Sequence, residues 1–549
     1  MSAQKHDTLQ TVRIPVKKER NISTAPTPLQ IFTREDLEKR NSISVADAVK
    51  QFAGVQVKDY GGIGGLKTVS VRSLGANHTG VMYDGLLLGD AQGGQADLGK
   101  FSLDNVQQVQ LYNAGPAEIL LPARAFSSAA LLLVNTVSAS QKDFSRQMSL
   151  GIRQGSFGYL SPYFSLRSSS RKKFSTGISG TYQQATGNYP FISYSSTGVP
   201  EKRINSGIKA FRLEYDAVYQ LNDSDRVLFK TYYYHSNMGL PGAIILYNTG
   251  ISNQTLKDEN IFIQAKREKT ISAKSRLLLS AKYSADNYFY KDPAYPNSFG
   301  KLENTFHQRE IYFSAAYQYQ LNPAISIAAA SDLFNSRLRR SDFLAQGFAN
   351  PNRNSFLNNL ALRFLKNNVE ASGNLLYTVI NEKTSLGKAG RNLRQITPAV
   401  AASVAPFSGV PIRIRAFYKR IFRAPTFNDL YYTNIGNTDL RPEYADQYNA
   451  GISYSSGSAG LIKKIIFTGD AYLNTVTDKI LAVPRQNLFQ WSMQNIGSVR
   501  IKGADIGLHL DFNSFKNLGI SSDISYGLQE ALDVTDKSSP LYRPNFPIL

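Results

Sequence analysis

The sequence predicts an all-β protein that crosses a membrane as an antiparallel barrel, preceded by a small α+β unit. Three observations lead to this fold class. From about residue 147 onward, segments of roughly ten residues alternate in hydrophobicity, as transmembrane strands do. The connections between these segments alternate between short and long. No run of about 18 apolar residues occurs, so the sequence offers no helix that could cross a bilayer.

The α+β unit comes first and is expected to span residues 23–138. Thr33 can cap a helix over residues 35–40, which carries acidic side chains in its first turn. Ser44 can cap a second helix over residues 45–52. Both helices are short, so we expect them to pack against strands of the same unit rather than to form a separate helical layer.

Residues 68–88, T-V-S-V-R-S-L-G-A-N-H-T-G-V-M-Y-D-G-L-L-L, form the centre of this unit. They predict a strand, a Gly/Asn loop, a second strand and a tight turn at Asp84-Gly85. Arg72 is the one Lys or Arg of the stretch, and a buried Arg requires a carboxylate partner. His78 lies in the loop, where we expect a solvated side chain rather than a ligand.

The barrel strands follow. In residues 412–419 the even-numbered side chains are apolar or aromatic, whereas three of the four odd-numbered ones are basic. Residues 465–474 and 505–512 show the same period of two. Short connections are expected at 168–173, 221–225, 321–324, 365–368 and 513–517, and long ones at 184–207, 237–258, 286–303, 339–355, 423–442 and 477–494. A strict long and short alternation is typical of a membrane barrel meander, and it gives about 17 strands.

Composition narrows the functional classes. The 549 residues include no Cys, which excludes disulfide frameworks, thiolate metal sites and Cys nucleophiles. The net charge is +21, but Lys and Arg are scattered along the chain, so we expect basic turns and lumen faces rather than a nucleic-acid surface. The five His are far apart in sequence, and no catalytic or metal-binding motif appears. We therefore expect no enzyme, no metal site and no cofactor.

Several phrases resemble TonB-dependent outer-membrane receptors. V-S-V-R-S … V-M-Y-D-G-L-L-L is similar to that family's V-x-V-R-G … V-L-x-D-G-x-x-L, with Ser73 in place of the usual glycine. S-I-S-V-A-D-A-V-K-Q-F-A-G-V-Q-V resembles another plug phrase, with Ala53 at a customary proline. The most specific match is F-R-A-P-T-F-N-D-L at residues 422–430, followed by G-N and L-R-P-E. The chain looks most like the cobalamin receptor subfamily.

The resemblance implies an organisation into three parts. Residues 1–22 would be a periplasmic arm, 23–138 a plug inside the barrel lumen, and 139–549 the transmembrane barrel in the outer membrane of a Gram-negative bacterium, in contact with lipid and lipopolysaccharide. The arm resembles a TonB box, which pairs with TonB by strand addition and draws energy from ExbB-ExbD. The residues of this box are Asp7, Thr8, Leu9, Gln10, Thr11 and Val12. The N-terminus lacks the apolar region of a signal peptide.

The family binds its ligand between the plug apices and the external loops, which implies candidate site residues here. From the plug these are Tyr60, Gly62, Ile63, Lys67, Asp90, Gln92 and Gln95, and from the barrel Tyr189, Phe191, Tyr288 and Tyr290. Aromatic loops suit a bulky, partly apolar ligand, although some of these rings could instead form an interfacial girdle. For Arg72, which should face the barrel wall, Glu443 is the first candidate partner in a latch between plug and barrel.

The implied function is energy-coupled import of a scarce, large nutrient, with a corrinoid as the leading ligand. A ferric siderophore or haem is the alternative within the family, and an adhesin or sensor barrel without transport is the alternative outside it. A surface lipoprotein is a further candidate partner. Acidic loop residues bind Ca²⁺ in the cobalamin subfamily, but residues 184–207 contain only Glu201, which argues against calcium here.

The strand count predicts an incomplete barrel. The family closes at 22 strands, whereas the sequence gives about 17, and single-chain bacterial barrels have an even number. Pro544 and Pro547 near the end do not suit a closing central strand. We therefore expect a truncation at the C-terminus or a second chain that completes the wall, since an open edge in lipid leaves backbone groups unpaired.

Overall fold

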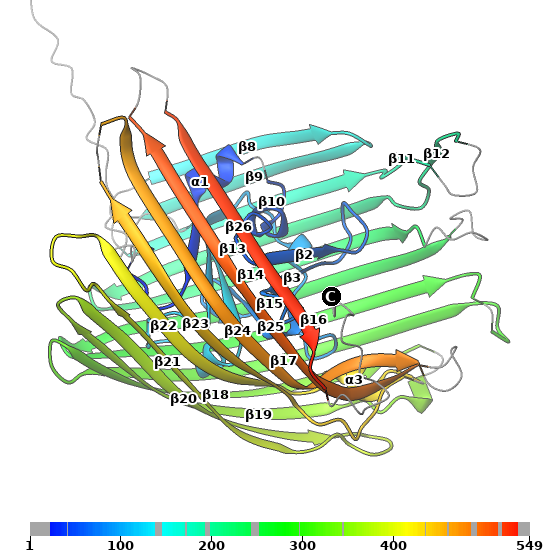
Figure 1. Cartoon of the computed structure of the whole chain (residues 1–549). Helices are drawn as coiled ribbons and strands as arrows, with labels where there is room; N and C mark the ends of the chain where they lie inside the picture. The colour runs from blue at the N-terminus through cyan, green and yellow to red at the C-terminus, as the bar shows by residue number, and fades with distance from the viewer. Residues whose placement is uncertain are drawn as a thin grey trace, which may run out of the picture.

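The structure is a computed structural model. It describes residues 22, 24–40, 42–137, 145–170, 173–192, 198–242, 252–295, 297–342, 345–433, 435–457, 460–484, 491–513 and 519–535. The proposed TonB box at residues 7–12 and the two late prolines lie outside this part of the chain. A curved wall of strands surrounds the N-terminal unit, which we call the plug (Figure 1). Among the described residues, no helix is long and apolar enough to cross a membrane.

The plug is built on a five-stranded sheet in the order β1-β6-β7-β4-β5 and a separate β2-β3 hairpin. β4 runs parallel to β7, and the other pairs are antiparallel. Its elements are β1 (Leu29–Thr33), α1 (Arg34–Lys39), α2 (Val45–Val49), β2 (Val55–Asp59), β3 (Lys67–Val71), β4 (Thr79–Tyr83), β5 (Leu86–Leu87), β6 (Val106–Asn113) and β7 (Ala130–Thr136), with 3₁₀ turns at Ala76–His78, Leu98–Lys100 and Ala123–Phe126.

Local sequence signals account for the helix starts and the tight turn. Thr33 and Ser44 each cap a helix through a reciprocal capping box, with Asp36 and Asp47 respectively. The first helix has the predicted length but begins one residue earlier, whereas the second is shorter than the sequence predicts because it gives way to turns before residue 52. Asp84 and Gly85 have φ values of 49° and 89°, the pair of positive values that a two-residue hairpin loop between β4 and β5 requires.

The wall consists of seventeen strands in one antiparallel sheet, which confirms the expected barrel architecture and strand count. They are β8 (Ser145–Gly155), β9 (Tyr159–Ser170), β10 (Phe174–Ala185), β13 (Ile208–Asn222), β14 (Asp225–Leu240), β15 (Gln254–Ser272), β16 (Ser275–Asp292), β17 (Leu302–Gln320), β18 (Ile325–Arg340), β19 (Asn352–Lys366), β20 (Val369–Lys383), β21 (Leu393–Val404), β22 (Ile412–Arg423), β23 (Glu443–Ser456), β24 (Ile462–Pro484), β25 (Trp491–Phe512) and β26 (Ser521–Asp533).

The strand order returns from β26 to β8. The seventeen strands therefore form a closed barrel, which does not agree with the open edge expected from the strand count. Each other neighbouring pair in the wall has a residue-by-residue antiparallel register. At one end of the wall the connections have two to eight residues, and at the other they have nine or more except after β8 and β24. In outer-membrane barrels the short turns face the periplasm and the long loops face outward, so we call the two ends periplasmic and external.

Several predicted loops are partly strand. β16 extends to Asp292, so Tyr288 and Tyr290 lie in a strand rather than in a loop, and β24 and β25 take up most of the loop predicted at 477–494. Aromatic and β-branched side chains favour extended backbone, and paired strands can continue past the lipid boundary without exposing backbone groups to it. The loop at 184–207 holds a small hairpin of β11 (Pro190–Phe191) and β12 (Glu201–Lys202). The external connection after β22 contains the short helix α3 (Phe427–Tyr431), and another contains a 3₁₀ turn at Ala345–Gly347.

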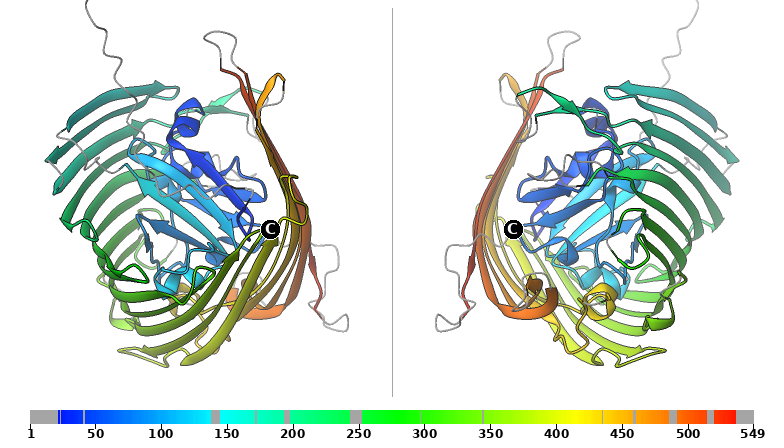
Figure 2. Two further views of the ribbon diagram at one scale, coloured as in Figure 1. Left: turned by 90° about the vertical axis from the view of Figure 1, so that its left-hand side faces the viewer. Right: turned by 90° about the vertical axis from the view of Figure 1, so that its right-hand side faces the viewer.

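The plug packs directly against the inner face of the wall. Figure 2 shows the plug strands enclosed between the strands that follow β8 and those that precede β26. A continuous cluster of buried side chains joins Val81, Tyr83 and Phe101 of the plug to Tyr232 and Phe262 of β14 and β15. The rings of Tyr232 and Phe262 stack with centroids 4.9 Å apart. This contact brings the plug loops close to the external half of β14–β16.

Candidate ligand-binding site

A plug loop, residues 88–97, reaches the external part of the wall and is fixed in place by backbone contacts. The Asp90 carboxylate accepts hydrogen bonds from the backbone N–H groups of Gln92 and Gly93 at 2.9 and 3.0 Å. The first N–H groups of α3, those of Phe427 and Asn428, donate to carbonyl oxygens of this loop at 2.9 and 3.0 Å. The loop is therefore held by its own turn and by a helix of the barrel.

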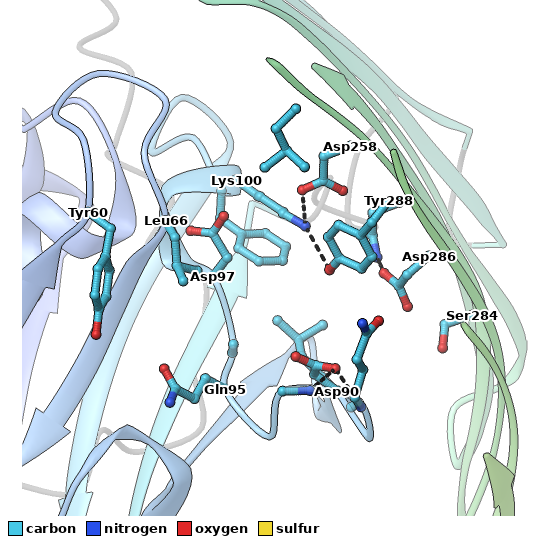
Figure 3. A pocket seen from close by; sticks show the side chains of 18 of the residues that line it. Tyr60, Leu66, Asp90, Gln95, Asp97, Lys100, Asp258, Ser284, Asp286 and Tyr288 are labelled. Carbon is cyan, nitrogen blue, oxygen red and sulfur yellow. Dashed lines mark hydrogen bonds and ion pairs between the residues drawn. The ribbon is translucent and has the colours of Figure 1, made fainter. Parts of the chain in front are cut away.

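A cavity of about 400 Å³ lies between this loop, the tip of the β2-β3 hairpin and strands β14–β16 (Figure 3). Its lining combines apolar, aromatic and acidic side chains. The principal lining side chains are Tyr60, Leu66, Asp90, Gln92, Gln95, Asp97, Lys100, Met238, Leu240, Leu256, Asp258, Asn260, Phe262, Lys282, Ser284, Asp286 and Tyr288. Apolar walls with a few convergent polar groups are the usual composition of a ligand site.

Lys100 is the central cation of the cavity. Its Nζ lies 2.6 Å from Asp258 Oδ2, donates to the Tyr288 hydroxyl at 3.4 Å, and sits 5.1 Å from the centre of the Tyr288 ring. Although burial opposes the charge, Asp258 and neighbouring acids raise the pKa of Lys100 well above its ordinary value. Lys100 is therefore a fixed positive charge that is already neutralised by the wall.

Acidic groups outnumber the cations around it. Four aspartates line the cavity, against Lys100 and Lys282. Burial raises the pKa of Asp90 and Asp97 in the plug, even though backbone N–H groups bond to both. The second carboxylate oxygen of Asp258, Oδ1, is buried and has no hydrogen-bond partner among the described residues. The cavity thus presents more acceptors than the protein itself satisfies.

The structure gathers some of the predicted ligand residues and separates others. Tyr60, Asp90, Gln92, Gln95 and Tyr288 line the cavity together. The remaining plug candidates do not line it, because each has a structural role elsewhere. The backbone N–H of Gly62 donates to Asp59 at 2.7 Å, Ile63 packs against the plug core, and Lys67 forms an ion pair with Asp47 at 3.1 Å.

The other barrel candidates also lie apart from the cavity. Tyr189 and Phe191 belong to the β11-β12 region. The ring centres of Tyr189 and Phe157 are 6.2 Å apart, and the Arg203 guanidinium lies 5.9 Å from the Phe191 ring centre. Tyr290 is on β16 beyond Tyr288, outside the residues that line the cavity. These positions were predicted from the aromatic character of loops, which does not specify where a side chain points.

Sequence reasoning missed Asp97, Lys100, Asp258 and Asp286. A usable signal was present in the strands: alternate positions in β15 and β16 carry polar side chains, and these face the lumen. Finding the site from this signal also requires the register between β15, β16 and the plug loop, which is a tertiary property. No group of three or more His, Asp or Glu that could hold a metal ion occurs in the described ranges.

Arg72 faces the wall and binds a lumen carboxylate, but the partner is Asp505 and not Glu443. Its Nε lies 2.8 Å from Asp505 Oδ2, its Nη1 donates to Asn449 Oδ1 at 2.8 Å, and the guanidinium covers the Tyr472 ring at 4.1 Å. Glu443 is six residues from Asn449 along β23, a distance of about 20 Å in a strand. It is therefore out of reach of the same side chain.

Glu443 instead binds a second plug residue that the sequence did not predict as a contact. His78 Nε2 lies 2.7 Å from Glu443 Oε1, and the same carboxylate bonds Lys479 at 2.9 Å and Arg423 at 3.2 Å. His78 is 2 % exposed, so the expectation of a solvated loop side chain was wrong. The 3₁₀ turn at Ala76–His78 directs this ring toward the wall. Burial lowers its pKa.

Comparison with known proteins agrees with this architecture. The family model described as "TonB dependent receptor-like, beta-barrel" matches residues 150–546, and the "TonB-dependent Receptor Plug Domain" matches residues 21–129. The chain is 22 % identical over 510 residues to the vitamin B12 transporter BtuB of Vibrio vulnificus (strain YJ016). The aligned region covers 92 % of this chain and 76 % of that protein.

Solved structures show the same fold. The copper transporter OprC superposes with a TM-score of 0.73 at 13 % identity, covering 92 % of this chain and 79 % of OprC. The siderophore receptor PirA from Pseudomonas aeruginosa superposes with a TM-score of 0.65 at 15 % identity, covering 91 % of this chain and 85 % of PirA. The barrel match alone covers more than half of the sequence, and the chain belongs to the TonB-dependent receptors, a family of receptors and transporters of the Gram-negative outer membrane.

Proposed function

We propose that this receptor imports a corrinoid, using the cavity between plug and wall as part of the binding site. Import would be driven by TonB and ExbB-ExbD through the arm at residues 7–12. The observation that carries the choice of ligand is the chemistry of the cavity, in which four aspartates and a tyrosine surround an already paired Lys100. The similarity to a vitamin B12 transporter supports the same choice.

The acidic lining favours a ligand that offers hydrogen-bond donors and carries no net negative charge near the wall. A corrinoid has a rim of amide groups, whose N–H donors suit carboxylates such as Asp286 and the unpaired oxygen of Asp258. Apolar side chains, including Met238 and Leu240, suit the methyl groups and the flat macrocycle between the amides. At about 400 Å³ the cavity would hold part of such a ligand.

The same lining disfavours the main alternatives. Haem carries two carboxylates and many ferric siderophores are anionic, so burying either against aspartates would place like charges together in a medium of low dielectric constant. Neutral or cationic iron chelates remain compatible with this chemistry, and they are the second candidate. The fold likeness to copper and siderophore receptors does not decide between ligands.

Binding and uptake measurements test the proposal. Purified receptor should bind cyanocobalamin or cobinamide in calorimetry, and a receptor-null strain expressing it should grow on a single corrinoid source. Asp286→Asn is the preferred variant, because Asp258 also neutralises Lys100. Since hydrogen bonds to charged groups contribute about 1.5–3 kcal/mol, Asp286→Asn should weaken corrinoid binding at least roughly tenfold.

The matched control is Asp439→Asn, an exposed carboxylate that pairs with Lys388 at the external end, away from the cavity. This variant should bind corrinoid like the wild type. Binding of haem or an anionic ferric chelate in the absence of corrinoid binding would contradict the proposal. So would an Asp286→Asn variant that binds corrinoid unchanged.

A further inference from the structure

Along the outer face of β18–β21, the outward side chains change in kind at three successive levels toward the external end. The first level is apolar. Leu333, Phe356, Leu360 and Tyr377 point outward and are between 38 % and 64 % exposed. Exposed large apolar side chains on the outside of a barrel wall are its lipid-facing band. This band marks where the hydrocarbon of the membrane contacts these strands.

The second level is made of amides. Toward the external end, the outward positions of β18 to β20 become Asn335, Asn352, Asn354 and Asn381. Asn335 Nδ2 donates to Asn352 Oδ1 at 2.5 Å and to Asn354 Oδ1 at 2.7 Å. Four amides directly above a lipid-facing band form a polar surface rich in donors and acceptors, of the kind that sugar hydroxyls can bond.

The third level is basic. Arg337, Asn352 and Lys383 stand in one register row across β18, β19 and β20. Strands are about 4.8 Å apart, so the backbones of Arg337 and Lys383 are separated by about 10 Å, close enough for two long side chains to reach one anion. Arg339 lies two residues beyond Arg337 on β18, nearer the external end of the strand. We call these four residues the rim groove. They line a cavity of about 500 Å³.

The rim groove has no internal counter-charge. Arg337 Nε bonds only a neutral group, Asn335 Oδ1, at 2.8 Å. The Arg339 and Lys383 side chains make no hydrogen bond or ion pair with any described residue, and no Asp or Glu faces outward on the described parts of β18–β21. Arg340, the next residue, points inward and is paired with Asp342 at 2.7 Å. The described part of the protein therefore supplies no anion to balance these cations, and a counter-anion has to come from outside it.

The height of the groove points to the source of that anion. Arg337 is four residues beyond Leu333, about 13 Å along the strand and about 10 Å along the barrel axis for a strand tilted by about 40°. Polar headgroups occupy the 5–8 Å or so on each side of the hydrocarbon core. A phosphate on a lipid whose chains contact Leu333 and Phe356 would lie at or just below the rim groove.

We propose that the rim groove binds the phosphorylated headgroup of a glycolipid anchored in the outer leaflet of the membrane. Arg337 and Arg339 supply planar guanidinium groups suited to phosphate oxygens, Lys383 adds a point charge, and the asparagines below bond the sugar. This site is on the outside of the barrel, and it is independent of the ligand cavity in its lumen.

The test compares two triple variants of the full-length receptor in detergent. One, Arg337→Gln/Arg339→Gln/Lys383→Gln, removes the groove cations. The other, Lys173→Gln/Lys274→Gln/Lys366→Gln, removes three exposed lysines from the periplasmic turns with the same change of net charge. Binding is measured by native mass spectrometry with an acylated diglucosamine bisphosphate as the probe. A basic residue near an anionic lipid surface contributes about fivefold in affinity, so the groove variant should bind on the order of a hundredfold more weakly.

Three further arms make the result decisive. The periplasmic variant should bind like the wild type, the same glycolipid without phosphates should bind weakly to all proteins, and Arg337→Lys/Arg339→Lys should keep most of the affinity because it keeps the charge. A groove variant that is folded, as judged by its resistance to unfolding in cold dodecyl sulfate, and that binds the bisphosphate like the wild type would overturn the proposal. Competition by free inorganic phosphate at a matching concentration would also overturn it, since the site would then not require a lipid.

Discussion

Buried charges determine how single plug residues meet the barrel wall. Arg72 is 1 % exposed and contacts Asp505, Asn449 and the Tyr472 ring. Glu443, the partner predicted for Arg72, binds His78 instead. The need of Arg72 for a carboxylate followed from its chemistry. The identity of that carboxylate did not, because it depends on the height of each residue on strands that are remote in sequence.

Replacing Asp505 by Asn should destabilise the protein strongly. The substitution leaves Arg72 buried without its counter-charge, and breaking one partner of a buried pair costs about 3–5 kcal/mol. The matched control is Asp478→Asn, which breaks an ion pair of Arg441 whose side chain is 57 % exposed and should cost less than about 1 kcal/mol. Urea unfolding in detergent micelles measures both. Equal losses for the two variants would mean that the Arg72 contact is not a stabilising one.

His78 should make stability depend on pH on the acid side of neutrality. Burial and the nearby cations Lys479 and Arg423 lower its folded pKa, although Glu443 opposes them, so the unfolded chain binds a proton more readily than the folded protein. Stability should therefore be full above the unfolded value of about 6.5 and should fall as pH decreases below it. His78→Gln should remove this component from the unfolding free energy measured between pH 5 and 8. A wild type that gains stability as pH decreases over that interval would contradict the assignment.

At the scale of elements, the parts that rest on local chemistry were predictable and those that rest on register were not. Capping signals at Thr33 and Ser44 located both plug helices, and the period of two located the strands. The ends of β16, β24 and β25 were missed, because turn residues mark loops only where pairing stops, and these strands stay paired beyond the predicted points. The site depends on the same register, which places Asp258 and Asp286 opposite the plug.

The cap of α2 provides a test of a local contribution. Ser44 and Asp47 bond reciprocally, with the Asp47 N–H donating to Ser44 Oγ at 3.3 Å, so Ser44→Ala should cost about 1 kcal/mol of stability. Ser42→Ala, two residues earlier and outside the helix, should be neutral within about 0.5 kcal/mol. The difference in urea midpoint between the two variants gives the value. If Ser42→Ala is as costly as Ser44→Ala, the cap does not stabilise the plug.

At the scale of the whole molecule, the ligand cavity and the external rim differ in the sign of their predominant charge. The cavity in the lumen is rich in aspartates although the chain carries a net charge of +21, and the outward external rim of β18–β21 is basic. The cavity therefore suits a solute rich in hydrogen-bond donors, whereas the rim suits an anionic lipid headgroup. The plug stands between the cavity and the periplasmic end, so we expect import to involve a rearrangement of the plug within the barrel.

We expect the work for such a rearrangement to be delivered through the N-terminal arm. If residues 7–12 pair with TonB by strand addition, Leu9→Pro or Val12→Pro should abolish uptake, because proline removes a backbone donor that the added strand needs. Binding of ligand at the cell surface should stay unchanged, since the cavity is built from residues 60 and beyond. Gln4→Pro, a proline of the same arm outside the box, is the matched control and should transport normally. Parallel assays of radiolabelled corrinoid binding and energy-dependent uptake in one strain separate the two steps. Uptake that survives both Leu9→Pro and Val12→Pro would place the TonB contact elsewhere in the chain.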